Sequence, residues 1–193
     1  QLGVQFATLH PLRLAEQRII IPVLRKGVMV GWQGRWPAEL NWKESRLNKY
    51  QTLTGMRKRF LIYNGDVALS RPFAIVVEGP TSAWPLWPNG CATFGNSVSY
   101  HQLAMLGEYC KSHPLVIIMD PDPIAQAEAL RVYERLRRLS PLAARVRLPD
   151  KMDPGEFQRQ GRLDDMWEII VSQCEQQSVR LDVADMKELP NGQ

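Results

Sequence analysis

Two short stretches of the sequence are apolar without interruption, and each ends in acidic residues followed by glycine or proline. They are residues 73–77, which Glu78 follows, and residues 115–119, which Asp120 and Asp122 follow. Each run is too short for a membrane helix, and its continuous apolar character predicts a strand buried on both faces. Helix-like segments come after both runs. The pattern therefore predicts an α/β fold with a mainly parallel sheet.

Amphipathic periodicity predicts three longer helices, near residues 99–112, 124–139 and 163–174. The serine and glutamine of Ser99-Tyr-His-Gln102 form a capping-box pattern that starts the first of them. The side chains predicted to face inward from the second helix are Leu130, Tyr133, Leu136 and Leu139, and its arginines are predicted to face solvent.

Proline and glycine divide the rest of the chain into shorter elements. Residues 18–24 and 28–32 flank a Lys26-Gly27 turn and predict a β-hairpin, in which Pro22 is tolerated only near an edge or a bulge. Pro85 and Pro88 cannot lie inside a long helix, so the helix after Glu78 must be short or broken. Further strands are predicted at residues 60–63, 91–94 and 145–148.

The composition is that of an ordinary soluble domain. The chain has 193 residues, of which 45% are hydrophobic and 23% charged, and no apolar run reaches the length of a membrane span. Three widely spaced cysteines support neither a disulfide framework nor a zinc site, which favours a reducing, cytoplasmic setting. Residues 1–17 show no clear period, and the chain resembles a fragment that starts within a longer protein.

Charge is distributed unevenly along the chain. Residues 1–71 contain 12 Lys and Arg against 4 Asp and Glu, whereas residues 72–193 contain 12 against 16. A basic surface attracts phosphate backbones, so the first third predicts a nucleic-acid partner. A solvated basic face without a partner is the alternative, and the neighbouring carboxylates make it the weaker one.

Glu78, Asp120 and Asp122 are the candidate metal ligands. Ligands of open α/β sheets bind at the carboxyl ends of the strands, where these three residues are expected to meet. Clustered carboxylates repel one another unless a cation lies between them, and carboxylate oxygens suit Mg²⁺ or Mn²⁺. Each motif alone has a plainer interpretation, since an Asp-x-Asp is often only a solvated turn.

The order of these motifs resembles the Toprim signature of bacterial-type primases, topoisomerases and some nucleases: Val77-Glu78-Gly79 closes one strand and Asp120-Pro-Asp122 a later one. In addition, residues 18–22, 31–35, 48–50 and 61–64 resemble, in order, the basic N-terminal subdomain of the bacterial-type (DnaG-like) primase catalytic core. In that family the corresponding arginine and Lys-Tyr pair face the crevice between two subdomains and contact nucleotide or template. The resemblance therefore implies binding roles for Arg35, Lys49 and Tyr50.

Two further positions follow from this resemblance. The family places an Asp-Pro after its last Toprim strand, which makes Asp153 a fourth candidate carboxylate, although Asp153 alone would be interpreted as a helix N-cap before Pro154. The family also has an aspartate four positions after the glutamate, and this chain has Ser82 there. That departure puts a second metal in doubt.

The resemblance implies a basic, β-rich subdomain over residues 1–71, a Toprim domain over 72–150 and a helical C-terminal region over 151–193. The activity it implies is metal-dependent synthesis of short RNA primers from ribonucleoside triphosphates on single-stranded DNA, with Glu78, Asp120 and Asp122 as catalytic residues. A replicative helicase is an expected partner through regions absent from this sequence. The alternatives are a Toprim nuclease and a catalytically weak nucleic-acid-binding module, the latter suggested by Ser82.

Overall fold

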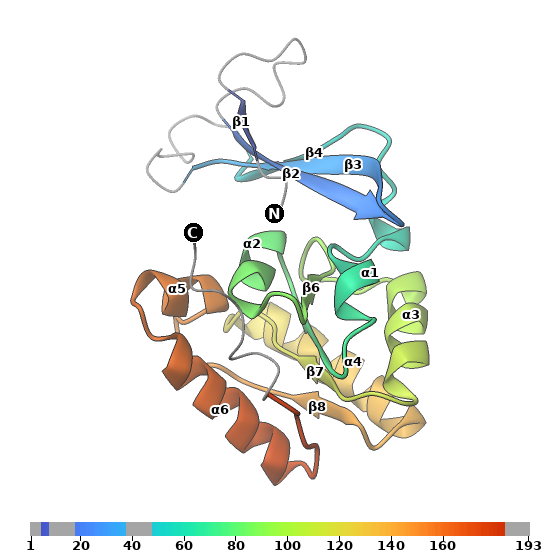
Figure 1. Ribbon diagram of the computed structural model, residues 1–193, viewed down its shortest axis with the longest axis vertical. Helices are drawn as coiled ribbons and strands as arrows, with labels where there is room; N and C mark the ends of the chain where they lie inside the picture. Colours follow the sequence, from blue (N-terminus) through green and yellow to red (C-terminus); the bar gives the residue numbers. More distant parts are fainter. Residues whose placement is uncertain (1–4, 8–17, 38–47, 184–193) are drawn as a thin grey trace. The chain divides into compact units, whose positions relative to one another are not determined.

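The structure, a computed structural model, describes residues 5–7, 18–37 and 48–183 (Figure 1). The chain forms two compact units, residues 1–57 and residues 58–193, and each is considered by itself. The division lies between Arg57 and Lys58, before the boundary predicted after residue 71. The described part leaves out most of residues 1–17, for which no periodicity was found. It also leaves out the last ten residues of the predicted C-terminal region.

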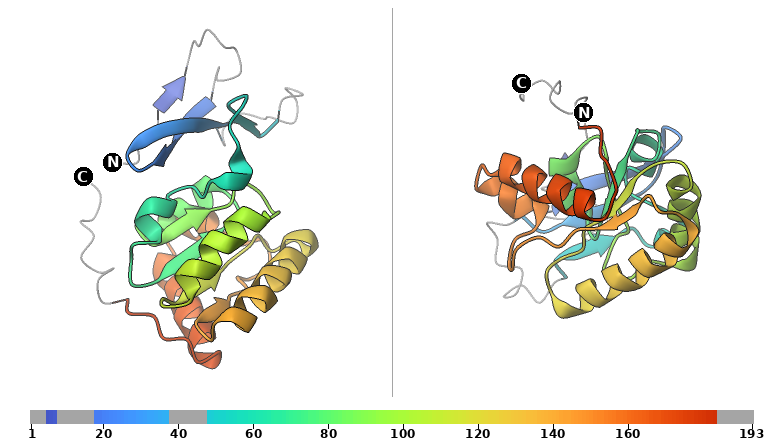
Figure 2. Two further views of the ribbon diagram at one scale, coloured as in Figure 1. Left: turned by 90° about the vertical axis from the view of Figure 1, so that its right-hand side faces the viewer. Right: turned by 90° about the horizontal axis from the view of Figure 1, so that it is seen from below.

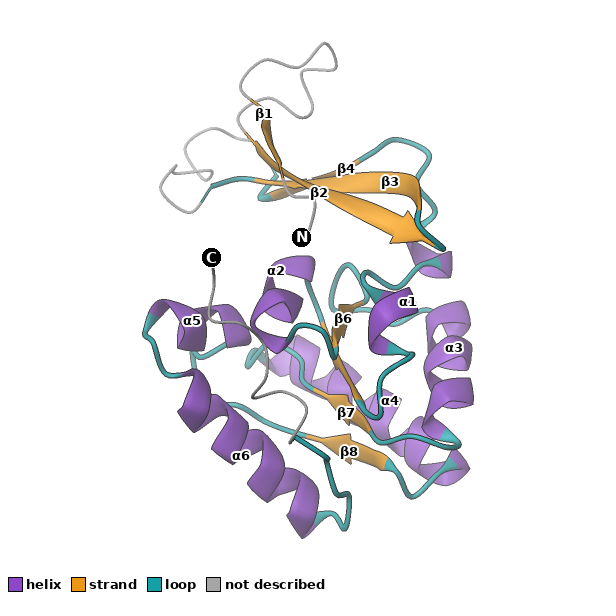
Figure 3. Cartoon of the chain, in the orientation of Figure 1, coloured by secondary structure: helices purple, strands orange, loops and turns teal. Residues whose placement is uncertain are grey.

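The N-terminal unit is an antiparallel sheet of four strands in the order β1-β2-β3-β4 (Figure 3). These strands are β1 (Gln5–Ala7), β2 (Arg18–Arg25), β3 (Val28–Arg35) and β4 (Tyr50–Thr52). The predicted hairpin is confirmed as β2 and β3. Its turn residues Lys26 and Gly27 both have positive φ, 52° and 74°, as a two-residue hairpin turn requires. Strand β4 is not among the predicted elements, because its three residues carry no usable period.

Pro22 is accommodated by its surroundings within β2. Strand β1 pairs only with residues 18–20 of β2, so its ladder ends before the proline. The register of β2 against β3 then shifts between Val23 and Leu24. Because proline has no N–H to give to a ladder, this position beside a bulge is one of the few that a strand offers it.

The C-terminal unit is built on a parallel sheet of four strands in the order β6-β5-β7-β8. They are β5 (Ala74–Val77), β6 (Gly90–Ala92), β7 (Leu115–Ile117) and β8 (Ala143–Arg145). The helical segments are η1 (Lys58–Phe60), α1 (Gly65–Ala68), α2 (Pro80–Ala83), η2 (Trp84–Leu86), α3 (Tyr100–Cys110), α4 (Pro123–Leu139), α5 (Pro154–Arg159) and α6 (Leu163–Gln176). Helices α3 and α4 cover one face of the sheet and α6 covers the other (Figure 2).

The predicted α/β fold is therefore confirmed. Every residue of β5 and β7 is buried, which is why these strands are apolar without alternation. The helix after Glu78 is short, as Pro85 requires: α2 ends at Ala83 and continues as the 3-10 turn η2. The capping box at the start of α3 is also confirmed, because Gln102 N donates to Ser99 Oγ while Ser99 N donates to Gln102 Oε1.

Two of the predicted strands need correction. Residues 60–63 do not form a strand, because the 3-10 turn η1 ends at Phe60 and only Tyr63 makes an isolated bridge, to Ala92. The final strand begins at Ala143 rather than at Arg145. Its two alanines are fully buried beside β7, and their small side chains gave a weaker hydrophobic signal than the valine and leucine that follow.

The inward face of α4 also differs from the prediction. Leu136 is buried as expected, but Leu130 is 43% exposed and Leu139 62% exposed. The stripe that packs on the sheet consists of Ala125, Ala129, Val132 and Leu136. Small side chains let the helix approach the sheet closely, so choosing the largest apolar residues as the core face was wrong.

All three cysteines are buried thiols, and burial raises the pKa of Cys91 and of Cys174 to about 12. They are thus inert core residues at neutral pH. Among the helices of the described ranges, none has the length and apolar character that crossing a bilayer requires.

Candidate active site

Glu78 and Asp120 lie at the carboxyl edge of the parallel sheet, after two neighbouring strands. Strands β5 and β7 pair with Val76 opposite Ile117. Continued by two residues, this register places Glu78 level with Met119, one residue before Asp120. Both carboxylates are half-buried. The topology thus brings the two motifs of the sequence to one edge, where open α/β sheets bind their ligands.

The main chain around Glu78 is held by the loop that follows β6. Gly95 N donates to the carbonyl of Glu78 at 2.9 Å, and Thr93 N donates to the carbonyl of Val77 at 3.2 Å. Phe94, between them, has a φ of 67°, and Gly95 has a φ of 146°. A non-glycine residue in the left-handed region costs free energy and persists only where its surroundings impose it, often at functional sites.

Asp120 and Asp122 occupy the turn between β7 and α4. Gln126 on α4 holds this turn, because its Nε2 donates to the carbonyls of Met119 and Asp120, both at 3.0 Å. Asp122 is the N-cap of α4, and its Oδ1 accepts from Ile124 N at 3.0 Å and Ala125 N at 3.1 Å. Its Oδ2 takes part in neither bond, and the residue is exposed. Capping and metal binding are therefore compatible at Asp122.

Asp153 is the N-cap of α5, which is the plainer interpretation that its sequence context allowed. Its Oδ1 accepts from Glu156 N at 2.6 Å, and Pro154 occupies the first position of the helix. Helix α5 packs against α2 and η2, the segment that follows Glu78. Ser82, at the position where the family has an aspartate, is 8% exposed within α2. A carboxylate at that position would be largely desolvated here.

The donor set at this edge fits a hard divalent cation shared with a substrate. Within the described ranges, no group of three or more His, Cys, Asp or Glu side chains is arranged to hold a metal ion by itself. Mg²⁺, however, is usually held by one or two carboxylates together with substrate phosphates rather than by a protein cage. Carboxylates on the neighbouring ends of β5 and β7 meet that requirement, and they offer none of the sulfur ligands that zinc favours.

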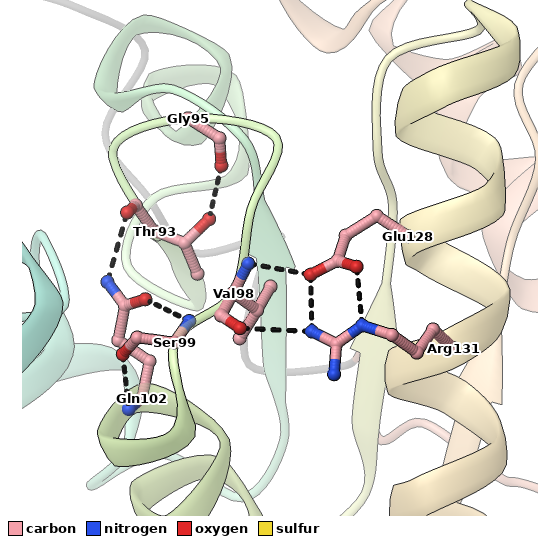
Figure 4. A network of polar contacts seen from close by, with 7 residues as sticks. All are labelled: Thr93, Gly95, Val98, Ser99, Gln102, Glu128 and Arg131. Carbon is pink, nitrogen blue, oxygen red and sulfur yellow. Dashed lines mark hydrogen bonds and ion pairs between the residues drawn. The ribbon is translucent and has the colours of Figure 1, made fainter.

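The loop after β6 is held from a second side by an ion pair on α4, which sequence analysis missed (Figure 4). Glu128 Oε1 accepts from Val98 N at 2.7 Å, while Arg131 Nη2 donates to the carbonyl of Val98 at 3.0 Å. Glu128 and Arg131 also pair with each other. Together they bind both main-chain groups of one residue, so Arg131 does not lie on a solvated face as predicted.

Gln102 completes the support of this loop (Figure 4). It is 1% exposed, and its Nε2 donates to the carbonyls of Thr93 at 3.0 Å and Leu61 at 2.8 Å. The amide of a buried glutamine must find hydrogen-bond partners, and here those partners lie in the loop and beside η1. The loop beside Glu78 is thus fixed by α3 and by α4.

Replacing Glu128 with Gln should loosen this loop. The hydrogen bond from Arg131 lowers the pKa of Glu128 in the folded protein. The pair therefore stabilises the fold fully above the ordinary glutamate pKa of about 4.3, and this stabilisation is lost as the pH falls through the lowered pKa. We expect a loss of about 1–2 kcal/mol at pH 7 that shrinks below pH ~4. Amide hydrogen exchange at Val98, with Glu134→Gln on the exposed side of α4 as control, measures it; equal protection in both variants would contradict the clamp.

In the N-terminal unit, the three residues with predicted binding roles lie together: Arg35 and Lys49 are beside the ring of Tyr50. Arg35 pairs with Tyr50 across β3 and β4. The Arg35 guanidinium carbon lies 5.6 Å from the centre of the Tyr50 ring, and Lys49 Nζ lies 5.9 Å from it. Two cations beside one aromatic ring form a local positive site suited to phosphate.

Arg18 fixes the segment that carries Lys49. Although it is an arginine, it is only 3% exposed, and its guanidinium donates to the carbonyls of Asn48 at 2.8 Å and Lys49 at 3.2 Å. The guanidinium carbon lies 5.2 Å from the centre of the Trp36 ring, and Trp36 N donates to the same Lys49 carbonyl at 2.9 Å. Arg18 was predicted only as part of a motif, because its burial cannot be read from one sequence.

Replacing Arg18 with Lys should weaken this segment, because an ammonium cannot reproduce two hydrogen bonds in the planar geometry of a guanidinium. We expect a loss of about 2 kcal/mol in the local opening free energy. Hydrogen exchange at the Trp36 amide measures it, and Arg25→Lys, at the exposed end of β2, is the control. Unchanged protection of Trp36 in Arg18→Lys would show that Arg18 does not hold the segment.

The chain is similar to known DNA primases in sequence and in fold. No family model matches the sequence. A DNA primase of Clostridium acetobutylicum is 32% identical over 155 residues, which cover 74% of this chain and 24% of the primase, so the chain spans about a quarter of that relative. The zinc-binding and RNA polymerase domains of the Aquifex aeolicus primase superpose with a TM-score of 0.68 at 23% identity, over 85% of this chain and 43% of that one.

A structure of the DnaG primase catalytic domain bound to single-stranded DNA superposes with a TM-score of 0.63 at 19% identity, over 83% of this chain and 52% of that one. The fold and the strand-end carboxylates thus define the class: this is a protein with the Toprim-containing catalytic-core fold of primases. With the sequence match added, the chain is similar to DnaG-like primases both in sequence and in fold.

Proposed function

We propose that this chain is a primase catalytic core, a nucleotidyltransferase that makes short RNA primers on single-stranded DNA. The observation that carries the proposal is the extent of the likeness. The superposition covers 85% of the chain, whereas the C-terminal unit, residues 58–193, accounts for only 136 of the 193 residues. The likeness therefore extends into the basic N-terminal unit. A likeness confined to the Toprim sheet would have been equally compatible with a nuclease.

The carboxylates would bind a divalent cation, Mg²⁺ or Mn²⁺, together with nucleotide phosphates. Asp120 and Asp122 are the proposed ligands, with Glu78 and Asp153 as further candidates. When bound, such an ion neutralises phosphate charge and lowers the pKa of an attacking hydroxyl. The chain itself would contribute rigid placement: Gln126 fixes the turn that carries Asp120, and the loop after β6 fixes the main chain of Glu78.

Glu78 would also accept or donate a proton at the reacting end. Its Oε2 is buried, so the carboxylate is partly withdrawn from water. A carboxylate in such surroundings is suited to general acid or base chemistry more than one on the open surface. In the N-terminal unit, Arg35, Lys49 and Tyr50 would bind phosphates of the template or of the incoming nucleotide.

The product formed from a mixture of Mn²⁺, the four ribonucleoside triphosphates and single-stranded DNA tests this proposal. We expect short RNA, resolved on a denaturing gel with labelled nucleotide, and intact DNA. Cleavage of labelled DNA would instead identify a Toprim nuclease. If neither product formed while DNA was still bound, the chain would be a catalytically weak binding module and the proposal would be wrong.

A further inference from the structure

An aromatic and basic surface lies in the C-terminal unit, in η1 and at the start of α3, and it shares no residue with the carboxylate site described above. It consists of Arg59, Phe60, Tyr100 and His101, which contact one another in series. The Arg59 guanidinium carbon lies 4.8 Å from the centre of the Phe60 ring, Phe60 and His101 have ring centres 4.2 Å apart, and Tyr100 and His101 have ring centres 6.0 Å apart. We name these four residues the aromatic platform.

Most of the platform faces solvent. Tyr100 is 78% exposed, Arg59 and His101 are also exposed, and Phe60 is half-buried. A single exposed aromatic residue needs no explanation. Here Tyr100 leaves most of its surface open to solvent, and the exposed side chains of His101 and Arg59 lie next to it along the series.

The platform is rigidly built. Ser99 Oγ donates to the carbonyl of Arg59 at 2.6 Å, and Gln102 Nε2 donates to the carbonyls of Lys58 at 3.2 Å and Leu61 at 2.8 Å. These bonds join η1, which carries Arg59 and Phe60, to the start of α3, which carries the other two rings. A surface that is ordered before binding loses less conformational entropy when a ligand arrives.

The charge of the platform selects the ligand. Segment η1 contains Lys58 and Arg59, and neither η1 nor the first turn of α3 contains an acidic residue. Exposed rings among cations suit an anionic chain that carries flat, unpaired rings of its own, which is the chemistry of single-stranded nucleic acid. Duplex DNA keeps its bases stacked on each other, so it could use only the cations.

We infer that Arg59, Phe60, Tyr100 and His101 form a stacking platform for single-stranded DNA, with bases against the rings and phosphates near Lys58 and Arg59. The choice of DNA rests on the proposed function, in which the long unpaired strand is the DNA template. Such a platform binds without reading sequence, because every base has a ring face. Its role would be to hold the template through residues that are not metal ligands.

The test is equilibrium binding by fluorescence anisotropy, without metal or nucleotides, so that it does not depend on synthesis. The probe is a labelled thymidine oligonucleotide of about 12 nucleotides. We expect Tyr100→Leu to weaken binding by the full chain roughly tenfold and Tyr100→Phe to restore it, because the ring face is what matters. Arg59→Gln should also weaken binding, and should reduce the slope of log K against log salt by about 0.7, the loss of one phosphate contact.

Two controls make the result specific. Leu139→Ala removes an exposed apolar side chain from the far end of α4 and should leave binding unchanged. A DNA duplex of equal length should bind Tyr100→Leu and the unchanged chain alike. Because Tyr100 is so exposed, the fold should tolerate its replacement, and circular dichroism checks this.

If Tyr100→Leu bound the oligonucleotide as tightly as the unchanged chain does, the inferred platform would be wrong. It would also be wrong if this substitution weakened binding of the duplex as much as binding of the oligonucleotide. Tighter binding of a uridine RNA of the same length would overturn the choice of DNA. Photo-crosslinking of an iodouracil-substituted oligonucleotide to Tyr100 or His101, mapped by mass spectrometry, supports the platform independently, and crosslinks found only elsewhere contradict it. If binding needs Tyr100 but no RNA is ever made, the platform stands and the proposed function fails.

Discussion

Replacing Asp120 with Asn should reduce RNA synthesis roughly 100- to 1,000-fold. The amide keeps the shape of the carboxylate but loses its charge, and charge is what a divalent cation requires of this ligand. The fold should remain intact and could gain slightly in stability without metal, because a like charge beside Glu78 is removed. The measurement is the rate of labelled nucleotide incorporation, with circular dichroism to confirm the fold.

The matched control for this substitution is Asp164→Asn, which removes an exposed carboxylate in the first turn of α6. It should leave synthesis unchanged. Binding of Mn²⁺ in the presence of a nucleotide, followed by calorimetry, separates metal loss from other causes. Unchanged Mn²⁺ binding by Asp120→Asn would remove Asp120 from the metal site.

Replacing Lys49 with Ala should weaken nucleotide and single-stranded DNA binding about fivefold and reduce the slope of log K against log salt by about 0.7. Lys49 is proposed to neutralise phosphate rather than to take part in bond formation, so Mn²⁺ binding at Asp120 should persist. The cation also lies beside the Tyr50 ring, which helps to hold its side chain near Arg35.

The control for Lys49 is Lys26→Ala, which removes an exposed cation from the hairpin turn of the same unit. A general effect of net charge would appear equally in both variants. If Lys49→Ala retained the affinity and the salt slope of the unchanged chain, its role as a phosphate contact would be wrong.

The sheet and its carboxylate edge could be predicted because burial on both faces leaves a strong trace in the sequence. Strand β5 is apolar at every position and stops at Glu78, and β7 is apolar and leads to Asp120. Neighbouring parallel strands must end at one edge, so the two motifs could be placed together without coordinates. The Lys26-Gly27 turn was equally clear, because its conformation restricts the residues that fit.

What the sequence did not reveal depends on contacts between distant positions. Arg18 and Gln102 have the composition of surface residues, and only the carbonyls around them show why both are buried. Arg131 was predicted to face solvent, because Val98, the residue that it and Glu128 bind, is 30 residues away in sequence from Glu128. Ala125 and Ala129 were passed over for larger residues, because one sequence does not show how closely a helix approaches a sheet.

Template-directed incorporation of a single nucleotide type in the presence of Mn²⁺ tests most directly whether this chain is a primase core. On a thymidine homopolymer the chain should join ATP into short RNA and should not join GTP, and on a cytidine homopolymer the preference should reverse. The same reactions with Asp120→Asn should give no RNA above background. Incorporation that ignored the template, or that survived the loss of Asp120, would contradict the account of this chain as a primase core acting through its strand-end carboxylates.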